Sequence, residues 1–132
     1  MTAGMVADRG AHQPERRVDK PWGHEIWFAV TDRYAGKIIH IAAGQELSLQ
    51  YHERKDETIY LLSGSMELEL DDDDGELQTM RLSPGQCQRI LVGRRHRMRA
   101  LIDTEVCEVS TPDLDDVVRL EDRYGRVETP GG

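Results

Sequence analysis

Between residues 25 and 110 the chain alternates short runs of β-forming residues with turn signals, and this pattern constrains the fold more than any other feature. The run 66–70 reads Met-Glu-Leu-Glu-Leu, so one face of a strand is apolar and the other is acidic. Four aspartates and Gly75 then form a turn, and the run 77–82 returns as the second arm of a hairpin. Further strands are expected at 25–30, 37–41, 47–52, 57–62, 86–92, 96–100 and 105–110. About nine short strands without a long amphipathic helix predict an all-β sandwich or barrel.

The two ends of the chain lack this pattern. Residues 1–17 mix Gly, Ala, Pro and charged residues without a period, so we expect a disordered arm there. We expect a single domain over residues 18–126, followed by a frayed end at 127–132. Within that domain the segment 113–126 fits either a short helical turn or an extended strap.

Charge and hydropathy exclude several classes of partner. The net charge of −8 argues against general nucleic-acid binding, which needs a basic surface. No apolar run approaches the ~18 residues of a membrane span, and the first residues lack the apolar stretch of a secretory signal. We therefore expect a cytoplasmic protein whose partner is a small molecule, not a nucleic acid or a membrane.

Four polar side chains are expected to point into the interior of the barrel. Gln50 and His52 lie two residues apart on one predicted strand and share a face, and Glu57 begins the next strand. His96 opens the segment His-Arg-Met-Arg-Ala, in which the alternate Met and Ala mark an interior face. Burying four such groups is costly unless a cation binds them.

This ligand set has a definite chemistry. Two imidazoles, one carboxylate and one amide oxygen suit Zn²⁺, Mn²⁺, Fe²⁺, Ni²⁺ or Co²⁺, and the sequence leaves the choice open. Only the carboxylate is anionic, so a bound dication keeps one net positive charge. Such a centre can polarise a carbonyl group or stabilise an enolate-like oxygen.

The same residues resemble the two cupin motifs. The first, G-x5-H-x-H-x(3,4)-E-x6-G, is matched by Gly44, His52, Glu57 and Gly64, with Gln50 in place of its first His. The second, G-x5-P-x-G-x2-H-x3-N, is matched by Gly85, Gly93 and His96, with Leu91 in place of its Pro and Ala100 in place of its Asn. The resemblance implies a double-stranded β-helix, or jelly-roll, barrel. An open barrel leaves edge strands that an N-terminal strand or a second copy must cover, so we expect a homodimer.

A closer resemblance is to the C-terminal cupin domain of type II phosphomannose isomerases, and it covers about residues 20–126. In that family a Gln-x-His pair, a Glu and a later His form the metal set, which implies that Gln50 is a ligand. The matching residues are Lys20-Pro21-Trp22-Gly23, the segment 47–52, Glu57, Ser63-Gly64, His96-Arg97 and the segment 118–126.

The sequence departs from this family around Glu57, where Lys55, Thr58 and Ile59 replace its Arg, His and Trp. Three functions therefore remain open. The first is a metal-dependent isomerase or epimerase of the mannose-6-phosphate isomerase type. The second is an iron- or nickel-dependent dioxygenase. The third is a sugar-binding cupin without catalysis, because fold alone does not decide among them.

An isomerase needs a base, and we expect it to be Glu108 or Lys55. Glu108 matches a Glu in the corresponding strand of the family, although the alternation also allows it to face solvent. His40 is a weaker candidate for the substrate pocket.

An isomerase of a sugar phosphate also needs a cationic group for the phosphate. Arg94, Arg95 and Arg97 bracket His96, and arginine binds oxyanions through two hydrogen bonds. We therefore expect these three arginines to bind the substrate. Pairing with the acidic residues between 67 and 74 is the alternative.

Overall fold

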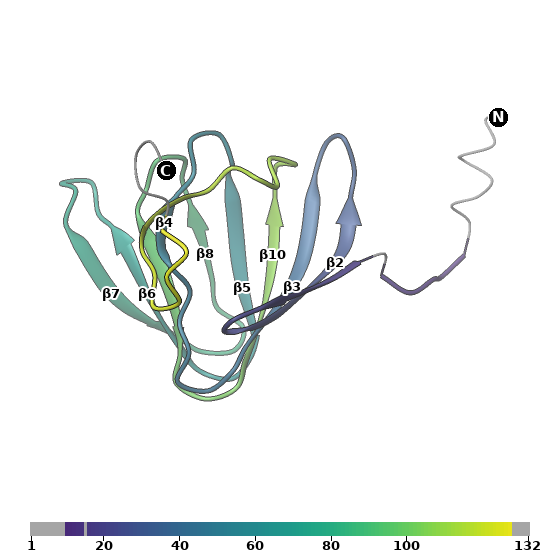
Figure 1. Cartoon of the computed structure of the whole chain (residues 1–132), viewed down its shortest axis with the longest axis horizontal. Helices are drawn as coiled ribbons and strands as arrows, with labels where there is room; N and C mark the ends of the chain where they lie inside the picture. The colour runs from purple at the N-terminus through teal and green to yellow at the C-terminus, as the bar shows by residue number, and fades with distance from the viewer. Residues whose placement is uncertain (1–9, 15, 128–132) are drawn as a thin grey trace.

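Two antiparallel β-sheets face each other in this computed structural model, which describes residues 10–14 and 16–127 (Figure 1). The larger sheet has the order β1-β2-β3-β10-β5-β8 and the smaller has the order β11-β4-β9-β6-β7. The predicted all-β barrel is confirmed. None of the described residues forms a helix long and apolar enough to cross a membrane. The strands are β1 (Arg16–Lys20), β2 (Gly23–Val30), β3 (Ala35–Ile41), β4 (Leu49–Tyr51), β5 (Glu57–Ser63), β6 (Met66–Asp71), β7 (Leu77–Leu82), β8 (Cys87–Ile90), β9 (His96–Ala100), β10 (Thr104–Ser110) and β11 (Val118–Glu121).

The inner face of the larger sheet changes from apolar to polar along its strands. Val106 of β10 lies opposite Leu61 of β5 and Ile39 of β3, and all three side chains are buried. Two residues further along β10, Glu108 lies opposite Lys37 on the same inner face. One end of the barrel is therefore a hydrophobic core, and the other end is lined by charged groups.

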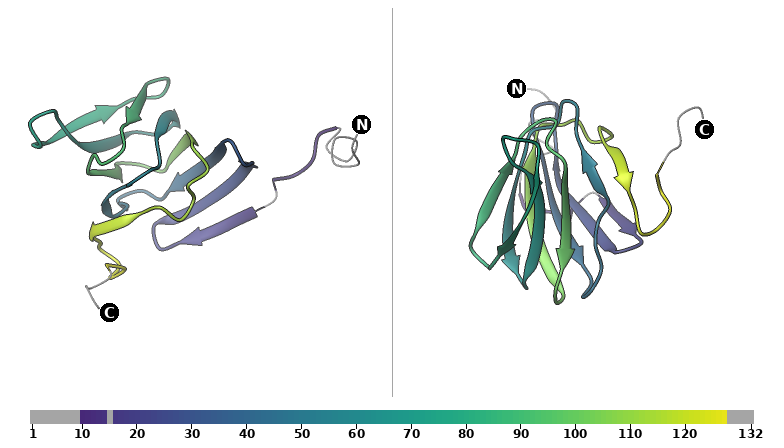
Figure 2. Two further views of the ribbon diagram at one scale, coloured as in Figure 1. Left: turned by 90° about the horizontal axis from the view of Figure 1, so that it is seen from above. Right: turned by 90° about the vertical axis from the view of Figure 1, so that its left-hand side faces the viewer.

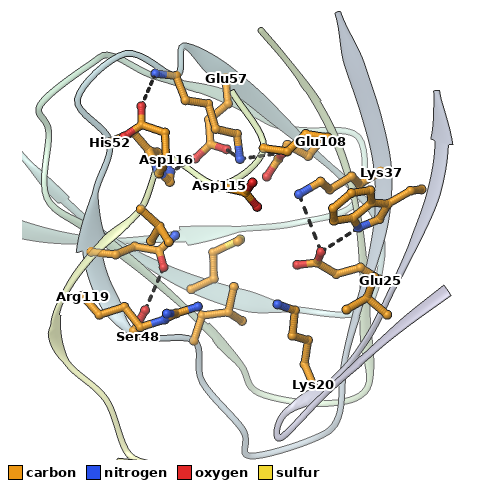
Figure 3. A pocket seen from close by; sticks show the side chains of 18 of the residues that line it. Lys20, Glu25, Lys37, Ser48, His52, Glu57, Glu108, Asp115, Asp116 and Arg119 are labelled. Carbon is orange, nitrogen blue, oxygen red and sulfur yellow. Dashed lines mark hydrogen bonds and ion pairs between the residues drawn. The ribbon is translucent and has the colours of Figure 1, made fainter. Parts of the chain in front are cut away.

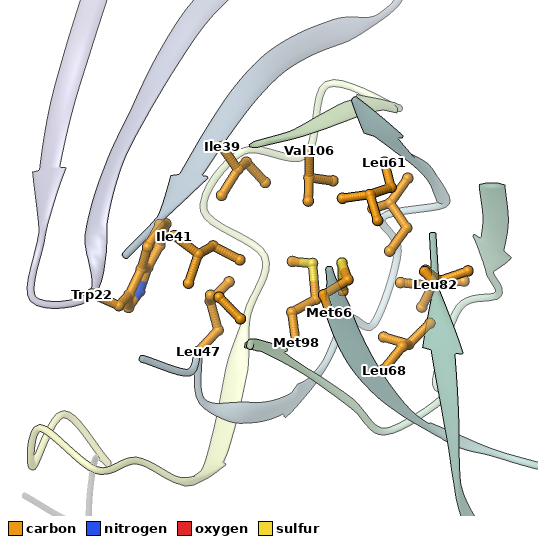
Figure 4. Close-up of a cluster of buried hydrophobic side chains, with 13 residues drawn as sticks. Trp22, Ile39, Ile41, Leu47, Leu61, Met66, Leu68, Leu82, Met98 and Val106 are labelled. Atoms are coloured by element: carbon orange, nitrogen blue, oxygen red, sulfur yellow. The ribbon is translucent and has the colours of Figure 1, made fainter. Parts of the chain in front are cut away.

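The hydrophobic core joins the apolar ends of both sheets (Figure 4). In the smaller sheet β9 contributes Met98 and Ala100 to the core, while His96 lies at the polar end of the strand. Burying one Leu or Ile side chain stabilises the fold by roughly 1.5–3 kcal/mol. The core consists of Trp22, Ile39, Ile41, Leu47, Ile59, Leu61, Met66, Leu68, Leu82, Ile90, Met98, Ala100 and Val106.

Two edge strands differ from the sequence prediction. β1 begins at Arg16, so the predicted disordered arm is wrong for residues 16 and 17, although residues 1–9 of that arm lie outside the described residues. The strand has one apolar residue, Val18, because its inner face looks onto the polar end of the barrel. After β10 the chain crosses the open end of the barrel to reach β11 (Figure 1 and Figure 2). Of the two alternatives for the segment 113–126, the structure therefore has the extended strap and not the short helical turn. The expected frayed end, 127–132, is described only at residue 127.

The turn between β1 and β2 requires the glycine at position 23. Gly23 has a φ of +155°, and a Cβ added there would lie 2.0 Å from the carbonyl oxygen of His40. Only glycine allows so close an approach. Because Lys20 is the β-pairing partner of Gly23, this turn also fixes where Lys20 lies at the mouth of the barrel.

Candidate metal centre and substrate cavity

A cavity of about 500 Å³ opens at the polar end of the barrel (Figure 3). Strands of both sheets form its walls, and the strap, which we define as residues 111–117, contributes further lining residues. Of its 21 lining residues, 11 are charged, whereas ligand pockets are usually lined mostly by apolar groups. The size therefore suits a small molecule, and the lining favours a polar one.

Three of the predicted metal ligands meet beside this cavity. Oε1 of Glu57 lies 3.3 Å from Nε2 of His52 and 3.2 Å from Nε2 of His96. Their ligand atoms all lie within 4.8 Å of one another, and all three residues are buried. Strands β5 and β9 and the end of β4 thus bring together residues that lie up to 44 positions apart in the chain.

The second nitrogen of each imidazole explains why a cation fits. Nδ1 of His52 contacts the backbone oxygen of Asp116, and Nδ1 of His96 lies 3.0 Å from that of Arg94. A carbonyl oxygen only accepts, so each Nδ1 carries the hydrogen, and in the neutral imidazole each Nε2 presents a lone pair. Neither Nε2 has a hydrogen-bond partner. A proton on one Nε2 would satisfy only the contact between that nitrogen and Glu57. A divalent cation would bind both nitrogens and the carboxylate at once.

The carboxylate of Glu57 is held in its anionic form. Burial by itself would raise the pKa of Glu57, but hydrogen bonds that His52 and His96 donate when Nε2 carries a proton, together with the charge of Lys55, outweigh burial and lower that pKa well below its usual value. An anionic oxygen between two imidazole lone pairs is the donor set that divalent transition metals prefer.

Gln50, the fourth predicted ligand, lies next to this cluster. It is paired with His96 across strands β4 and β9, and it lines the cavity. Its Oε1 accepts a hydrogen bond of 2.7 Å from the hydroxyl of Ser48. A carbonyl oxygen has two lone pairs, so one is left for a cation. Coordination by Gln50 stays a prediction.

The two predicted bases form a buried pair beside Glu57. Nζ of Lys55 lies 2.9 Å from Glu108 and 3.0 Å from Glu57. Glu108 lies on the inner face and lines the cavity. Burial and then the charge of Glu57 raise the pKa of Glu108 to about 7, against the effect of Lys55. Burial would lower the pKa of Lys55, but both carboxylates outweigh it and raise that pKa, so Lys55 is a cation.

Asp116 is a residue of the site that the sequence analysis missed. Its carboxylate accepts hydrogen bonds from the backbone amides of residues 53–55, which form the loop after His52. Burial would raise the pKa of Asp116, but these hydrogen bonds lower it. Because its backbone oxygen contacts His52, Asp116 connects the strap to the candidate metal ligands. No local pattern could reveal this contact, because the residues lie more than 60 positions apart.

Arg94, Arg95 and Arg97, which were expected to bind the substrate, do not line the cavity that contains Glu57. The alternation of β9 turns Arg97 outward, and the loop before β9 directs the other two toward the hairpin of β6 and β7. All three pair with carboxylates there, namely Asp73 for Arg94, Asp71 for Arg95 and Glu69 for Arg97.

His40 also lies outside this cavity. Ile39 and Ile41 point inward from β3, so His40 points outward. It stacks on His24 with a centroid distance of 5.0 Å and lies 3.5 Å from Glu105. The basic residues that do line the cavity include Lys20, Lys37 and Arg119, which the sequence analysis did not select.

Comparison with curated proteins points to one family. Residues 7–122 match the family described as mannose-6-phosphate isomerase C-terminal. A mannose-1-phosphate guanylyltransferase of Escherichia coli (strain K12) is 32% identical over 124 residues, which is 90% of this chain and 25% of that protein. The alginate biosynthesis protein AlgA of Pseudomonas aeruginosa is 32% identical over 127 residues, 92% of this chain and 25% of that protein. The chain thus spans about a quarter of the length of these curated relatives.

Solved structures agree on the fold. KdgF from Halomonas sp. has a TM-score of 0.65 at 27% identity, covering 76% of this chain and 91% of that one. Oxalate decarboxylase from Bacillus subtilis has a TM-score of 0.72 at 16% identity, covering 86% of this chain and 34% of that one. Both neighbours are cupins, so the predicted cupin barrel is confirmed.

Proposed function

Because this chain belongs to the mannose-6-phosphate isomerase C-terminal family of cupins, we propose that it is a metal-dependent isomerase or epimerase of a sugar or a sugar phosphate. One observation carries the proposal: two imidazole nitrogens without a hydrogen-bond partner converge with one carboxylate oxygen beside a polar cavity, and all three residues are buried. Burying these groups is costly unless a cation binds them, and a bound cation beside a polar cavity can act on a ligand there.

In this proposal His52, Glu57 and His96 hold the cation, and Gln50 supplies a fourth oxygen. When bound, a divalent ion such as Zn²⁺, Mn²⁺, Fe²⁺, Ni²⁺ or Co²⁺ supplies a Lewis acid for a carbonyl oxygen. The backbone oxygens of Asp116 and Arg94 orient the two imidazoles, so that each Nε2 would be available to a bound cation.

Glu108 is the proposed base. Isomerisation moves a proton between adjacent carbons of an open-chain sugar, so one group must accept the proton and return it. Glu108 lines the cavity and is buried, which shields the exchange from bulk water. Lys55 holds the Glu108 carboxylate 2.9 Å from its ammonium group and so fixes its position next to Glu57.

The test is incubation of metal-loaded protein with mannose 6-phosphate and related sugars in heavy water, followed by NMR. We expect the hydrogen on the carbon next to the carbonyl to exchange with solvent and the sugars to interconvert. Glu108→Gln should abolish exchange while the metal content stays the same. Glu105→Gln, on the outer face of the same strand, is the matched control and should exchange normally. Absence of exchange in the metal-loaded wild type would refute the proposal.

A second candidate rests on the same ligands, because two imidazoles and one carboxylate are also the set of non-haem iron oxygenases. Oxygen consumption by the iron-loaded protein, with no exchange in the first assay, would favour that function. Saturable sugar binding with neither activity would favour a non-catalytic cupin.

The proposal includes a homodimer formed through the outer face of the larger sheet. Tyr60, Leu62 and Val109 lie on neighbouring strands of this face, and Phe28 of β2 is exposed as well. Exposed apolar groups gathered on one sheet are typical of an interface. Sedimentation should give a dimer, and Val109→Lys should shift it to the monomer. A monomeric wild type at high protein concentration would exclude this part of the proposal.

A further inference from the structure

Two cationic side chains of the cavity lack partners. Lys20 and Arg119 both line the cavity, and neither side chain makes a hydrogen bond or an ion pair with any residue that the structure describes. Nε of Arg119 is buried without a hydrogen-bond partner. The other cations of the cavity are all engaged: Lys37 with Glu25, Lys55 with Glu57 and Glu108, Arg126 with Asp122, and Arg16 with the ring of Trp27.

Lys20 and Arg119 approach the same part of the cavity from different sheets. Lys20 ends β1 of the larger sheet, and Arg119 lies on β11 of the smaller one. In Figure 3 both lie on the side of the cavity that holds Ser48, away from Glu57 and Glu108. Burial lowers the pKa of Lys20; Glu25 opposes this effect, but Arg119 and Arg126 add to it, as expected for neighbouring like charges.

The sheet register sets the distance between this cationic end and the metal ligands. Arg119 pairs with Gln50 across β11 and β4, and Gln50 pairs with His96 across β4 and β9. Paired residues share a face, and each step between strands is about 4.8 Å, so the backbones of Arg119 and His96 are separated by about 10 Å. A sugar can lie between the two groups with one end at each.

Partly buried cations without counter-charges are costly unless a ligand supplies the charge. A phosphoryl group carries about −1.5 to −2 at neutral pH, and its oxygens suit the two parallel N–H groups of an arginine. We infer that Lys20 and Arg119 form an anion subsite that binds the phosphoryl group of the substrate, with the carbonyl end of the sugar toward His52, Glu57 and His96. For the identity of that sugar the inference rests on the proposed function.

The test compares mannose 6-phosphate with mannose by calorimetry on metal-loaded protein. Lys20→Gln and Arg119→Gln should each weaken binding of mannose 6-phosphate by about 10- to 100-fold, the effect of losing one charge-assisted contact. Binding of mannose and the metal content should not change. Arg95→Gln is the matched control, because Arg95 is paired with Asp71 on the outer surface. Melting curves show whether each variant is folded, and Lys20→Gln decides the matter if Arg119→Gln does not fold.

Binding without turnover separates this inference from the proposed function. Inorganic phosphate should compete with mannose 6-phosphate for the wild type and should lose this ability in both variants. If both variants lose the binding of phosphate but the metal-loaded wild type isomerises no sugar, the anion subsite is supported and the proposed function fails. The inference is overturned if the wild type binds mannose 6-phosphate no more tightly than mannose, or if folded variants bind it as the wild type does. Tighter binding of a sugar carboxylate than of mannose 6-phosphate also overturns the phosphoryl assignment.

Discussion

The charged groups outside the smaller sheet and those inside the barrel are made of the same residue types but are balanced differently. On the outer face, Arg97 and Arg99 of β9 lie opposite Glu69 and Glu67 of β6 in the strand ladder. Arg99 also lies 2.8 Å from Glu46. Each guanidinium therefore contacts at least two carboxylates, so its charge is balanced without any ligand, although Nε of Arg97 has no hydrogen-bond partner.

The cavity leaves charges and lone pairs unsatisfied. Nε2 of His52 and Nε2 of His96 face the same carboxylate oxygen, and Lys20 and Arg119 form no ion pair with the described residues. The outer network thus stabilises the fold only modestly, as partly exposed ion pairs do, whereas the proposed cation and anionic ligand would satisfy the groups left open in the cavity. The balance of charges, more than their number, distinguishes a binding site from a surface.

The largest expected effect is the loss of the metal when its anionic ligand is removed. Glu57→Gln should lower metal affinity by more than about 100-fold, because changing even the groups that support a ligand costs about 10- to 100-fold. Elemental analysis and a competition titration with a chelating dye measure this affinity. Glu69→Gln changes a carboxylate of the outer network and should leave the affinity unchanged. Equal metal binding by wild type and Glu57→Gln would place the cation elsewhere.

Removal of the metal should also destabilise the wild type, since the cation binds only the folded protein. At a free metal concentration of 100 times Kd the metal contributes about 2.7 kcal/mol. For a chain of this size EDTA should then lower Tm by about 5–15 °C. Glu57→Gln should melt at the same temperature with and without EDTA. An unchanged Tm in wild type that contained metal beforehand would mean that the unsatisfied donors of the cavity are not its binding site.

The inward position of the candidate metal ligands could be predicted from the sequence because strand alternation is local. In the segment His-Arg-Met-Arg-Ala one rule assigns His96 and Met98 to the interior and Arg97 to the surface. The same rule already argued against Arg97 as a substrate ligand. Arg97 was selected because it follows His96 in the sequence, but consecutive residues on a strand point to opposite faces of the sheet.

The remainder of the site depends on contacts between distant segments. Asp116 reaches His52 through the strap, and Arg119 reaches the cavity only because β11 pairs with β4. Lys20 lies on a strand with almost no apolar residues, so hydrophobic periodicity did not predict that strand. Local sequence patterns find residues that face a core, and they miss polar strands whose inner face lines a cavity.

Asp116 is a charged residue of the cavity whose carboxylate already has its hydrogen-bond partners within the protein. Asp116→Ala removes the acceptor of three backbone amides and should lower the free energy of unfolding by about 1–2 kcal/mol. It should also weaken metal binding by about 10-fold through His52. Urea unfolding and the dye titration measure the two effects. Asp115→Ala removes the exposed neighbouring carboxylate and should change neither the free energy of unfolding nor the metal affinity. An equal effect of both substitutions would mean that the loss of a negative charge, and not the loss of the hydrogen bonds, is the cause.

The smallest effect is expected on the outer surface. Arg99→Gln removes the guanidinium that contacts Glu46, Glu67 and Glu69, and it should lower the free energy of unfolding by less than about 1 kcal/mol. High salt should reduce that difference further, because exposed charges are screened. Urea unfolding at low and high salt measures both. Metal content and sugar binding should stay at the wild-type level. A loss of either would show that the outer network supports the cavity, and that the two regions are coupled through β9, the strand that carries both Arg99 and His96.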